Sequence, residues 1–137
     1  ALKIRPALQE GKVVICDRFF DTTLAYQGAG MGVDKATLQG IHQLAIGMYP
    51  DMTVLMDGPP EVFLQRMQSE ERDEVNKYDK LGLPFYERAR EAYLDQAKTY
   101  PESYLVVDAN QPRDQVFAQM LPTLMKIKNL MSPRPTP

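Results

Sequence analysis

Three short apolar runs in this chain each stop at an aspartate, and stretches with helical spacing separate them. The runs are residues 13–16 (VVIC) before Asp17, 52–56 (MTVLM) before Asp57, and 104–107 (YLVV) before Asp108. Continuous apolar runs are typical of parallel strands buried on both faces, and parallel strands joined through helices form right-handed crossover units. We therefore expect an α/β fold with three layers around a parallel sheet.

The end of the first run carries the most informative pair of side chains, Asp17 and Arg18. In open α/β sheets, ligands bind beyond the carboxyl ends of the strands. A carboxylate there can hold a metal ion or orient its water, and a guanidinium fork matches two phosphate oxygens. The pair suits a magnesium–phosphate substrate, and a surface ion pair that ends a strand explains it equally well.

Composition excludes several classes of protein. A chain of 137 residues with 44% hydrophobic content is expected to form one domain with a core. A net charge of −2 gives no general attraction to nucleic acid. Cys16 is the only cysteine, and its apolar neighbours predict a small buried hydrophobe rather than a catalytic thiol. No apolar run approaches the roughly 20 residues of a membrane span, so we expect a cytoplasmic protein without membrane contact.

Helical spacing predicts the elements around the runs. Helices are expected over residues 1–10, from a cap at Asp21 or Thr22 to Gln27, over 34–48 with Asp34 as the cap, from 60 to 66, over 85–100 and over 113–129. Gly11 and Pro101 follow two of these helices as stop signals. We expect the single histidine, His42, to be solvated and Asp57 to be structural.

Three helices carry stripes that are expected to face a core. In the helix over 85–100, Phe85, Ala89, either Ala92 or Tyr93, and Gln96 lie along one face. In the helix over 34–48 the stripe is Leu38, Ile41, Leu44, Ala45 and Met48. In the helix over 113–129 it is Val116, Phe117, Met120, Leu121, Leu124 and Ile127.

Five segments of the chain resemble bacterial thymidylate kinase, which phosphorylates dTMP with ATP. The segment DRFFDTTLAYQGAGMG follows IRPALQEGKVVIC and precedes MDGPPEVFLQR, FYERAREAY and VVDANQ, in the family's order. The resemblance covers about residues 2–128. It implies the fold of the P-loop nucleoside monophosphate kinases, transfer of the γ-phosphoryl group of MgATP to dTMP, and a homodimer.

The phosphate-binding loop of such kinases, GxxxxGK[ST], does not occur in the 137 residues. The glycine cluster at residues 28–32 has no following Lys-Ser or Lys-Thr, and we interpret it as a loop. The chain is therefore expected to be the C-terminal portion of the enzyme, with a sheet incomplete at its N-terminus and no activity alone. The alternatives are a non-catalytic remnant or interaction domain with the kinase fold, and a related deoxynucleoside kinase.

The acceptor side is expected around Arg18, Thr23, Tyr26 and Gln27. On a helix the last three share one face, Gln27 offers a donor and an acceptor to a base edge, and Thr23 offers a hydroxyl. Tyr26 beside a deoxyribose would exclude a 2′-hydroxyl by its bulk. The residues alone favour a packed Tyr26 and a solvated Gln27, whereas the resemblance implies that all four bind dTMP.

Residues 66–82 form the most charged stretch of the chain, and such a stretch is usually a solvated surface. The resemblance implies that it is the lid that closes on ATP, with Arg66, Arg72 and Lys77 as its cations. Many relatives carry an arginine where this chain has Lys77, which supplies a charge without a bidentate fork. The catalytic set is then Asp17, Arg18 and either lid cation, Arg72 or Lys77.

The loop after the third run contains Asn110 and Gln111, which the resemblance places beside the adenine of ATP. A turn and helix cap built by Asp108 or Asn110 explains the same residues. Asp17 is the candidate for indirect contact with Mg²⁺. We expect a partial kinase domain over residues 1–130 and a disordered tail over 131–137.

Overall fold

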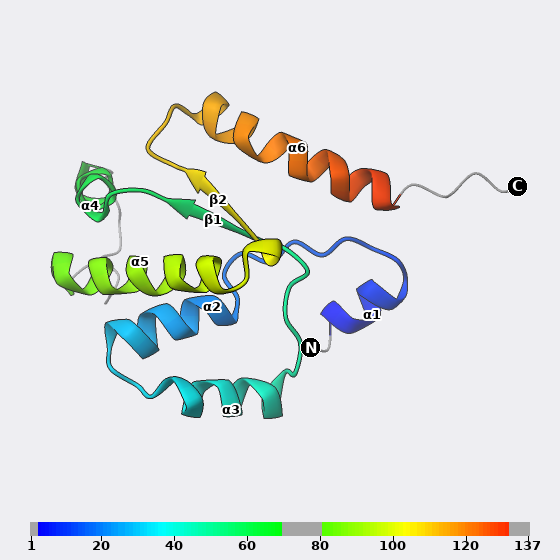
Figure 1. Cartoon of the computed structure of the whole chain (residues 1–137), viewed down its shortest axis with the longest axis horizontal. Helices are drawn as coiled ribbons and strands as arrows, with labels where there is room; N and C mark the ends of the chain where they lie inside the picture. Colours follow the sequence, from blue (N-terminus) through cyan, green and yellow to red (C-terminus); the bar gives the residue numbers. More distant parts are fainter. Residues whose placement is uncertain (1–2, 70–80, 132–137) are drawn as a thin grey trace, which may run out of the picture. The chain divides into compact units, whose positions relative to one another are not determined.

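The computed structural model of the chain describes residues 3–69 and 81–131 (Figure 1). It divides into two compact units, Ala1–Tyr49 and Pro50–Pro137, and each is described by itself. The single domain expected over residues 1–130 stays a prediction. None of the helices described is long and apolar enough to cross a membrane.

The first unit consists of four helical segments. They are α1 (Ile4–Gln9), α2 (Phe20–Thr23), the π-helix η1 (Leu24–Gly30) and α3 (Lys35–Ala45). Gly11 follows α1 with a φ of 74°, a left-handed conformation that glycine adopts without steric cost, so the predicted stop is confirmed. The glycine cluster is not simply a loop, because residues 28–30 belong to η1.

The cap of α3 is confirmed, whereas the cap of α2 was predicted wrongly. The Asp34 carboxylate accepts hydrogen bonds from the backbone N–H of Thr37 at 2.8 Å and from its hydroxyl at 2.9 Å. These bonds favour the charged carboxylate and lower the pKa of Asp34. Phe19 stands at the N-cap of α2, and Asp21 and Thr22 lie inside the helix.

The core of the first unit is a small cluster of Phe20, Leu24 and Leu38, with Phe19 packed against it. His42 is also buried, at 3% exposure, so its predicted solvation is wrong. Residues four apart lie on the same face of a helix, and His42 follows Leu38 by four.

The rest of the stripe predicted for α3 is wrong as well. Ile41 is 59% exposed and Leu44 is 91% exposed. Both side chains point away from the face of α3 that carries Leu38 and His42. The helix also ends at Ala45, before Met48, since Gly47 turns the backbone with a φ of 57°.

The strand predicted over residues 13–16 is not present. Val13 is 52% exposed, Ile15 is 94% exposed and Cys16 is exposed, so the prediction of a buried thiol is wrong too. A strand needs a neighbouring backbone to pair with. The sheet among the described residues joins two later strands and does not include this segment.

The second unit contains the sheet. Its elements are β1 (Thr53–Asp57), α4 (Pro60–Ser69), α5 (Gly82–Thr99), the short 3₁₀ helix η3 (Pro101–Ser103), β2 (Tyr104–Asp108) and α6 (Arg113–Met131). The two strands are parallel and in register from Thr53 beside Tyr104 to Asp57 beside Asp108, as predicted for parallel crossover units. Figure 1 shows α5 and α6 on opposite sides of this strand pair.

Burial on both faces of the strands is only partly confirmed. Val107 of β2 is fully buried, whereas Val54 and Met56 of β1 are 36% and 48% exposed. Among the described elements of the second unit, β1 pairs with β2 alone and has an open edge on its other side. A three-layer sheet of more strands therefore remains a proposal.

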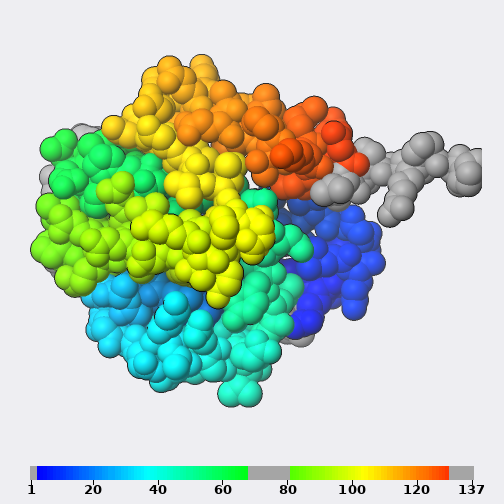
Figure 2. Space-filling view, viewed as in Figure 1, coloured from blue at the N-terminus to red at the C-terminus, as the bar shows by residue number. Residues whose placement is uncertain are grey.

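The two long helices differ in how well their buried faces were predicted. In α5, Phe85, Ala89 and Gln96 are buried as expected. In α6, Val116 is buried, but Phe117, Leu121 and Leu124 are 52%, 44% and 40% exposed, and the side chains of α6 are open on the face seen in Figure 2.

The length of α6 explains why most of its stripe is exposed. Its 19 residues span about 28 Å, whereas the five residues of β2 span about 17 Å, so the strand covers only part of the helix. The helix also continues through residue 131, the first residue of the predicted tail. Residues 132–137 lie outside the described residues.

Candidate functional site

The turn at Arg18 is the most unusual backbone feature of the first unit. Its φ is 61°, and among the described residues it is the one non-glycine residue with a positive φ. The left-handed region crowds the Cβ atom, and such residues cluster at functional sites, where the surrounding structure holds them in place. The Cys16 thiol donates to the Arg18 carbonyl at 3.5 Å across this turn.

The turn brings two of the predicted acceptor residues together. The guanidinium carbon of Arg18 lies 4.9 Å from the centre of the Tyr26 ring, a cation–π contact. Arg18 and Asp17 are exposed, and Tyr26 is partly buried. The guanidinium of Arg18 therefore packs against an aromatic face while the residue as a whole is exposed.

The two remaining acceptor residues lie on the same helical segment. Thr23 is the last residue of α2, and Gln27 lies in the π-helix η1, where its carbonyl accepts the backbone N–H of Val33 at 2.9 Å. Both side chains are partly buried. No sequence pattern predicted a π-helix, which is a rare element that frequently occurs at functional sites.

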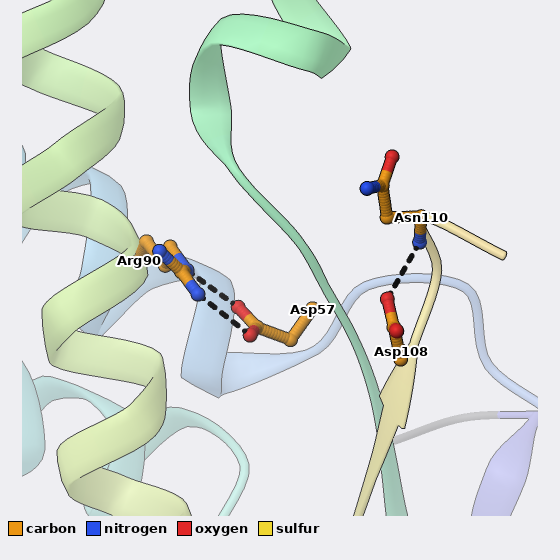
Figure 3. Close-up of polar contacts among 4 residues, drawn as sticks. All are labelled: Asp57, Arg90, Asp108 and Asn110. Carbon is orange, nitrogen blue, oxygen red and sulfur yellow. Dashed lines mark hydrogen bonds and ion pairs between the residues drawn. The ribbon is translucent and has the colours of Figure 1, made fainter.

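At the carboxyl end of β1, the Asp57 carboxylate is held by Arg90 of α5 (Figure 3). Nε donates to Oδ1 at 2.7 Å and Nη2 donates to Oδ2 at 2.9 Å. The hydrogen bond to Asp57 raises the pKa of Arg90. The structural role expected for Asp57 agrees with this contact, whereas Arg90 as its partner was missed, because the two are far apart in the sequence.

At the end of β2, the Asp108 carboxylate organises the loop that follows. Oδ1 accepts the backbone N–H of Asn110 at 2.9 Å, as Figure 3 shows, and Oδ2 accepts the Gln111 amide at 2.8 Å. These bonds, that of Gln111 first, lower the pKa of Asp108. The turn that the sequence offered as an alternative is therefore present.

Arg66 of α4 completes this cluster. Its guanidinium donates to the Ala109 carbonyl at 3.2 Å and to the Asn110 side-chain oxygen at 3.3 Å, and it lies 5.4 Å from the Phe63 ring centre. Three predicted donor-side residues, Arg66, Asn110 and Gln111, thus gather at one strand end.

Gln119 of α6 was missed by the sequence interpretation. Its amide accepts the Asp108 N–H at 2.9 Å and donates to the Asp108 carbonyl at 3.2 Å. It therefore holds the backbone of Asp108, where the loop begins, through contacts from α6. A glutamine on a helix carries no sequence signal for such a contact.

Residues 70–80 lie outside the described residues, and with them Arg72 and Lys77. The predicted lid has helical ends, because Arg66 lies inside α4 and Gly82 opens α5.

The carboxylates of the described residues determine how the site could hold Mg²⁺. The described residues contain no group of three or more His, Cys, Asp or Glu that could hold a metal ion. Asp17 is a single exposed carboxylate. Such a carboxylate fits an ion that arrives with the substrate phosphates and keeps several of its waters.

Parallel strands flanked by helices, with polar loops at their carboxyl ends, define the class of α/β proteins that bind ligands at that edge. The family model described as thymidylate kinase matches residues 1–120. The chain belongs to the thymidylate kinase family, whose members are nucleoside monophosphate kinases.

Curated relatives agree with this assignment. The thymidylate kinase of Geobacillus sp. is 40% identical over 126 residues, which is 90% of this chain and 59% of the relative. That of Clostridium novyi is 42% identical over 121 residues, 88% of this chain and 59% of the relative. That of Pseudomonas fluorescens is 40% identical over 130 residues, 92% and 61% respectively. The chain thus spans about 59% of the length of the first two relatives.

Proposed function

We propose that the complete protein to which this chain belongs transfers the γ-phosphoryl group of MgATP to dTMP, giving dTDP and ADP. The observation that carries the proposal is Arg18, held at a φ of 61° with its guanidinium over Tyr26, in a chain of the thymidylate kinase family. Its fork would bind the dTMP phosphate through two parallel hydrogen bonds.

The proposed roles of the other acceptor residues depend on where Arg18 binds the phosphate. The Tyr26 ring, fixed under Arg18, would lie beside the deoxyribose and exclude a 2′-hydroxyl. Gln27 and Thr23 would contact the thymine edge, with the amide as donor and acceptor. Asp17, next to Arg18, would orient a water of the Mg²⁺ that arrives with ATP.

The donor side is proposed at the end of β2. Arg66, Asn110 and Gln111 form one hydrogen-bonded group with Asp108, and the loop they hold would border the adenine. Arg72 or Lys77 would bring a cation to the transferring group when the lid closes, and that closure would exclude water.

Family membership extends this proposal. We also propose that the complete protein has a three-layer sheet of the P-loop nucleoside monophosphate kinase type, forms a homodimer and is cytoplasmic. The curated relatives contain sequence beyond the matched part, and we infer that the complete protein contains a phosphate-binding loop there. The 137 residues alone should then show no ATP-dependent phosphorylation of dTMP, since positioning of the donor phosphates supplies most of the catalysis.

The test is steady-state ADP release by the complete protein with dTMP, with the ribonucleotide counterpart of dTMP and with thymidine. Turnover with dTMP and little with the ribonucleotide is the expected result. Turnover with thymidine alone would favour a deoxynucleoside kinase. Binding of dTMP without turnover would favour a remnant of the kinase fold.

A glutamine variant tests the acceptor assignment. Gln27→Leu should raise the KM for dTMP about tenfold and leave the KM for ATP unchanged, because a base edge loses its hydrogen bonds. Gln39→Leu, at an exposed position of α3, is the matched control and should change neither. Equal effects of Gln27→Leu on both substrates would indicate a packing role.

A further inference from the structure

His42 lies in an aromatic cluster that has no role in the function proposed above. Its ring stacks on Phe20, with centroids 3.9 Å apart and planes 15° from parallel. Phe19 meets the ring edge-on at 5.9 Å, and Tyr49 lies 4.8 Å away at a tilt. The imidazole is therefore enclosed by three rings, two of which lead directly into α2.

The polar atoms of His42 close the end of α3. Nε2 lies 2.8 Å from the Met48 carbonyl, and because a carbonyl only accepts, Nε2 carries the hydrogen. Nδ1 has no hydrogen-bond partner within the described part of the chain. The backbone carbonyl of His42 accepts from Ile46 at 2.8 Å and from Gly47 at 3.0 Å. The ring and the donor thus make separate contacts, the ring to Phe20 and the donor to Met48.

The stacked contact reaches the candidate acceptor site through the backbone. Phe20 is the first residue of α2, two positions after Arg18, and α2 continues without a break into η1, which carries Tyr26. A non-glycine residue at a φ of 61° keeps that conformation only when its surroundings hold it. The His42 ring fixes the first residue after this turn that is buried.

We propose that His42 is a positioning residue for the acceptor site: its ring, stacked on Phe20, holds the start of α2 so that Arg18 stays over Tyr26. This inference rests on the proposed function. His42 acts through Phe20, and its hydrogen bond to Met48 serves the stability of α3 alone.

Two variants of the complete protein separate the ring from the donor. His42→Phe keeps a flat ring and loses the donor to Met48, whereas His42→Gln keeps a donor and loses the ring. His42→Gln should raise the KM for dTMP about tenfold with the KM for ATP unchanged. His42→Phe should keep the KM for dTMP within about twofold of wild type although its midpoint of thermal unfolding falls.

The thiol of Cys16 provides a readout that does not depend on activity. Because this thiol contacts the Arg18 carbonyl at 3.5 Å, its rate of alkylation by iodoacetamide, measured on the Cys16 peptide by mass spectrometry, reports the turn. The rate should rise several-fold in His42→Gln and match wild type in His42→Phe. Leu44→Gln introduces the same side chain at a 91% exposed position of α3 and should change nothing.

An alkylation rate in His42→Gln equal to that of wild type would overturn the inference. A KM for dTMP that follows the unfolding midpoint in both variants would also overturn it, because a purely structural residue behaves in that way. If the wild-type protein does not phosphorylate dTMP, the proposed function fails, and the alkylation rates still decide the role of His42.

Discussion

Arg90 on α5 donates two hydrogen bonds, at 2.7 and 2.9 Å, to the carboxylate of Asp57 at the end of β1. The fork geometry matches a carboxylate, and the side chains are 39% and 19% exposed. The pair joins the carboxyl end of a strand to the helix that follows the predicted lid. It therefore fixes the strand edge where the donor loop begins, since the Ala109 N–H donates to the Asp57 carbonyl at 2.7 Å.

Arg90→Met should lower the free energy of unfolding by about 1–2 kcal/mol, because partial exposure reduces the value of a bidentate pair. A double-mutant cycle with Asp57→Asn, measured by urea unfolding, isolates the interaction. Lys98→Met is the control on the same helix, since the Lys98–Asp95 pair at 3.6 Å is about three-quarters exposed and should contribute nothing measurable. Additive effects of the Arg90 and Asp57 changes would contradict the prediction.

Replacement by alanine should change the stability of the protein in opposite directions at two glycines. A Cβ at Gly58 would lie 2.8 Å from the Phe63 ring, so Gly58→Ala must displace that ring and should cost about 1–2 kcal/mol. Gly40, inside α3, has open space around it, and Gly40→Ala should stabilise the protein by about 0.5–1 kcal/mol. Thermal unfolding of both variants tests the pair, and a stable Gly58→Ala protein would mean that Phe63 moves freely.

Stability should fall in acid through Asp34 and Asp108. Hydrogen bonds from Thr37 and from Gln111 lower the pKa of these two carboxyls below the ordinary value of 3.8. A folded state with a lowered pKa binds fewer protons than the unfolded state, so the stabilisation is present above about pH 4 and lost below it.

Thermal melts of Asp34→Asn and Asp108→Asn from pH 7 to pH 3 measure this effect, because asparagine keeps an acceptor and removes only the charge. The difference in midpoint between wild type and each variant should shrink as the pH falls below about 4. A difference that stays constant across this range would show that the charge contributes nothing.

The elements that were predicted best are those whose burial depends on the residue pattern of the element itself. Helix α5 has a clear apolar face, and Phe85 and Ala89 are buried as expected. Strands β1 and β2 were found from their composition, each within one residue of its observed bounds. The run at residues 13–16 has a similar composition and is nevertheless not a strand in the described residues, because strand formation depends on pairing, which composition does not reveal.

The candidate site was predicted from family resemblance more than from physical pattern. Arg66 comes from α4, whereas Asn110 and Gln111 lie in the loop after β2, and no periodicity indicated that they would meet. The contact between Asp57 and Arg90 joins residues 33 apart, and the left-handed conformation of Arg18 has no signature in side-chain type. Such features depend on tertiary packing, which overrides local propensity.

We propose that Arg18 adopts a strained backbone conformation that presents its guanidinium to the phosphate of dTMP. Glycine adopts a φ of 61° freely, whereas a residue with a Cβ loses roughly 1 kcal/mol there. Arg18→Gly should therefore relieve the backbone and remove the guanidinium at once. Arg18→Lys keeps a charge without the fork and should give an intermediate activity.

The most direct measurement is kcat/KM for dTMP of the complete protein carrying Arg18→Gly, taken together with its midpoint of thermal unfolding. We expect kcat/KM to fall at least about a hundredfold while the midpoint stays equal to or above that of wild type. Unchanged kcat/KM would mean that Arg18 does not bind the phosphate of dTMP. A fall in both kcat/KM and the midpoint would mean that Arg18 stabilises the fold. Either result would contradict the proposed role of Arg18.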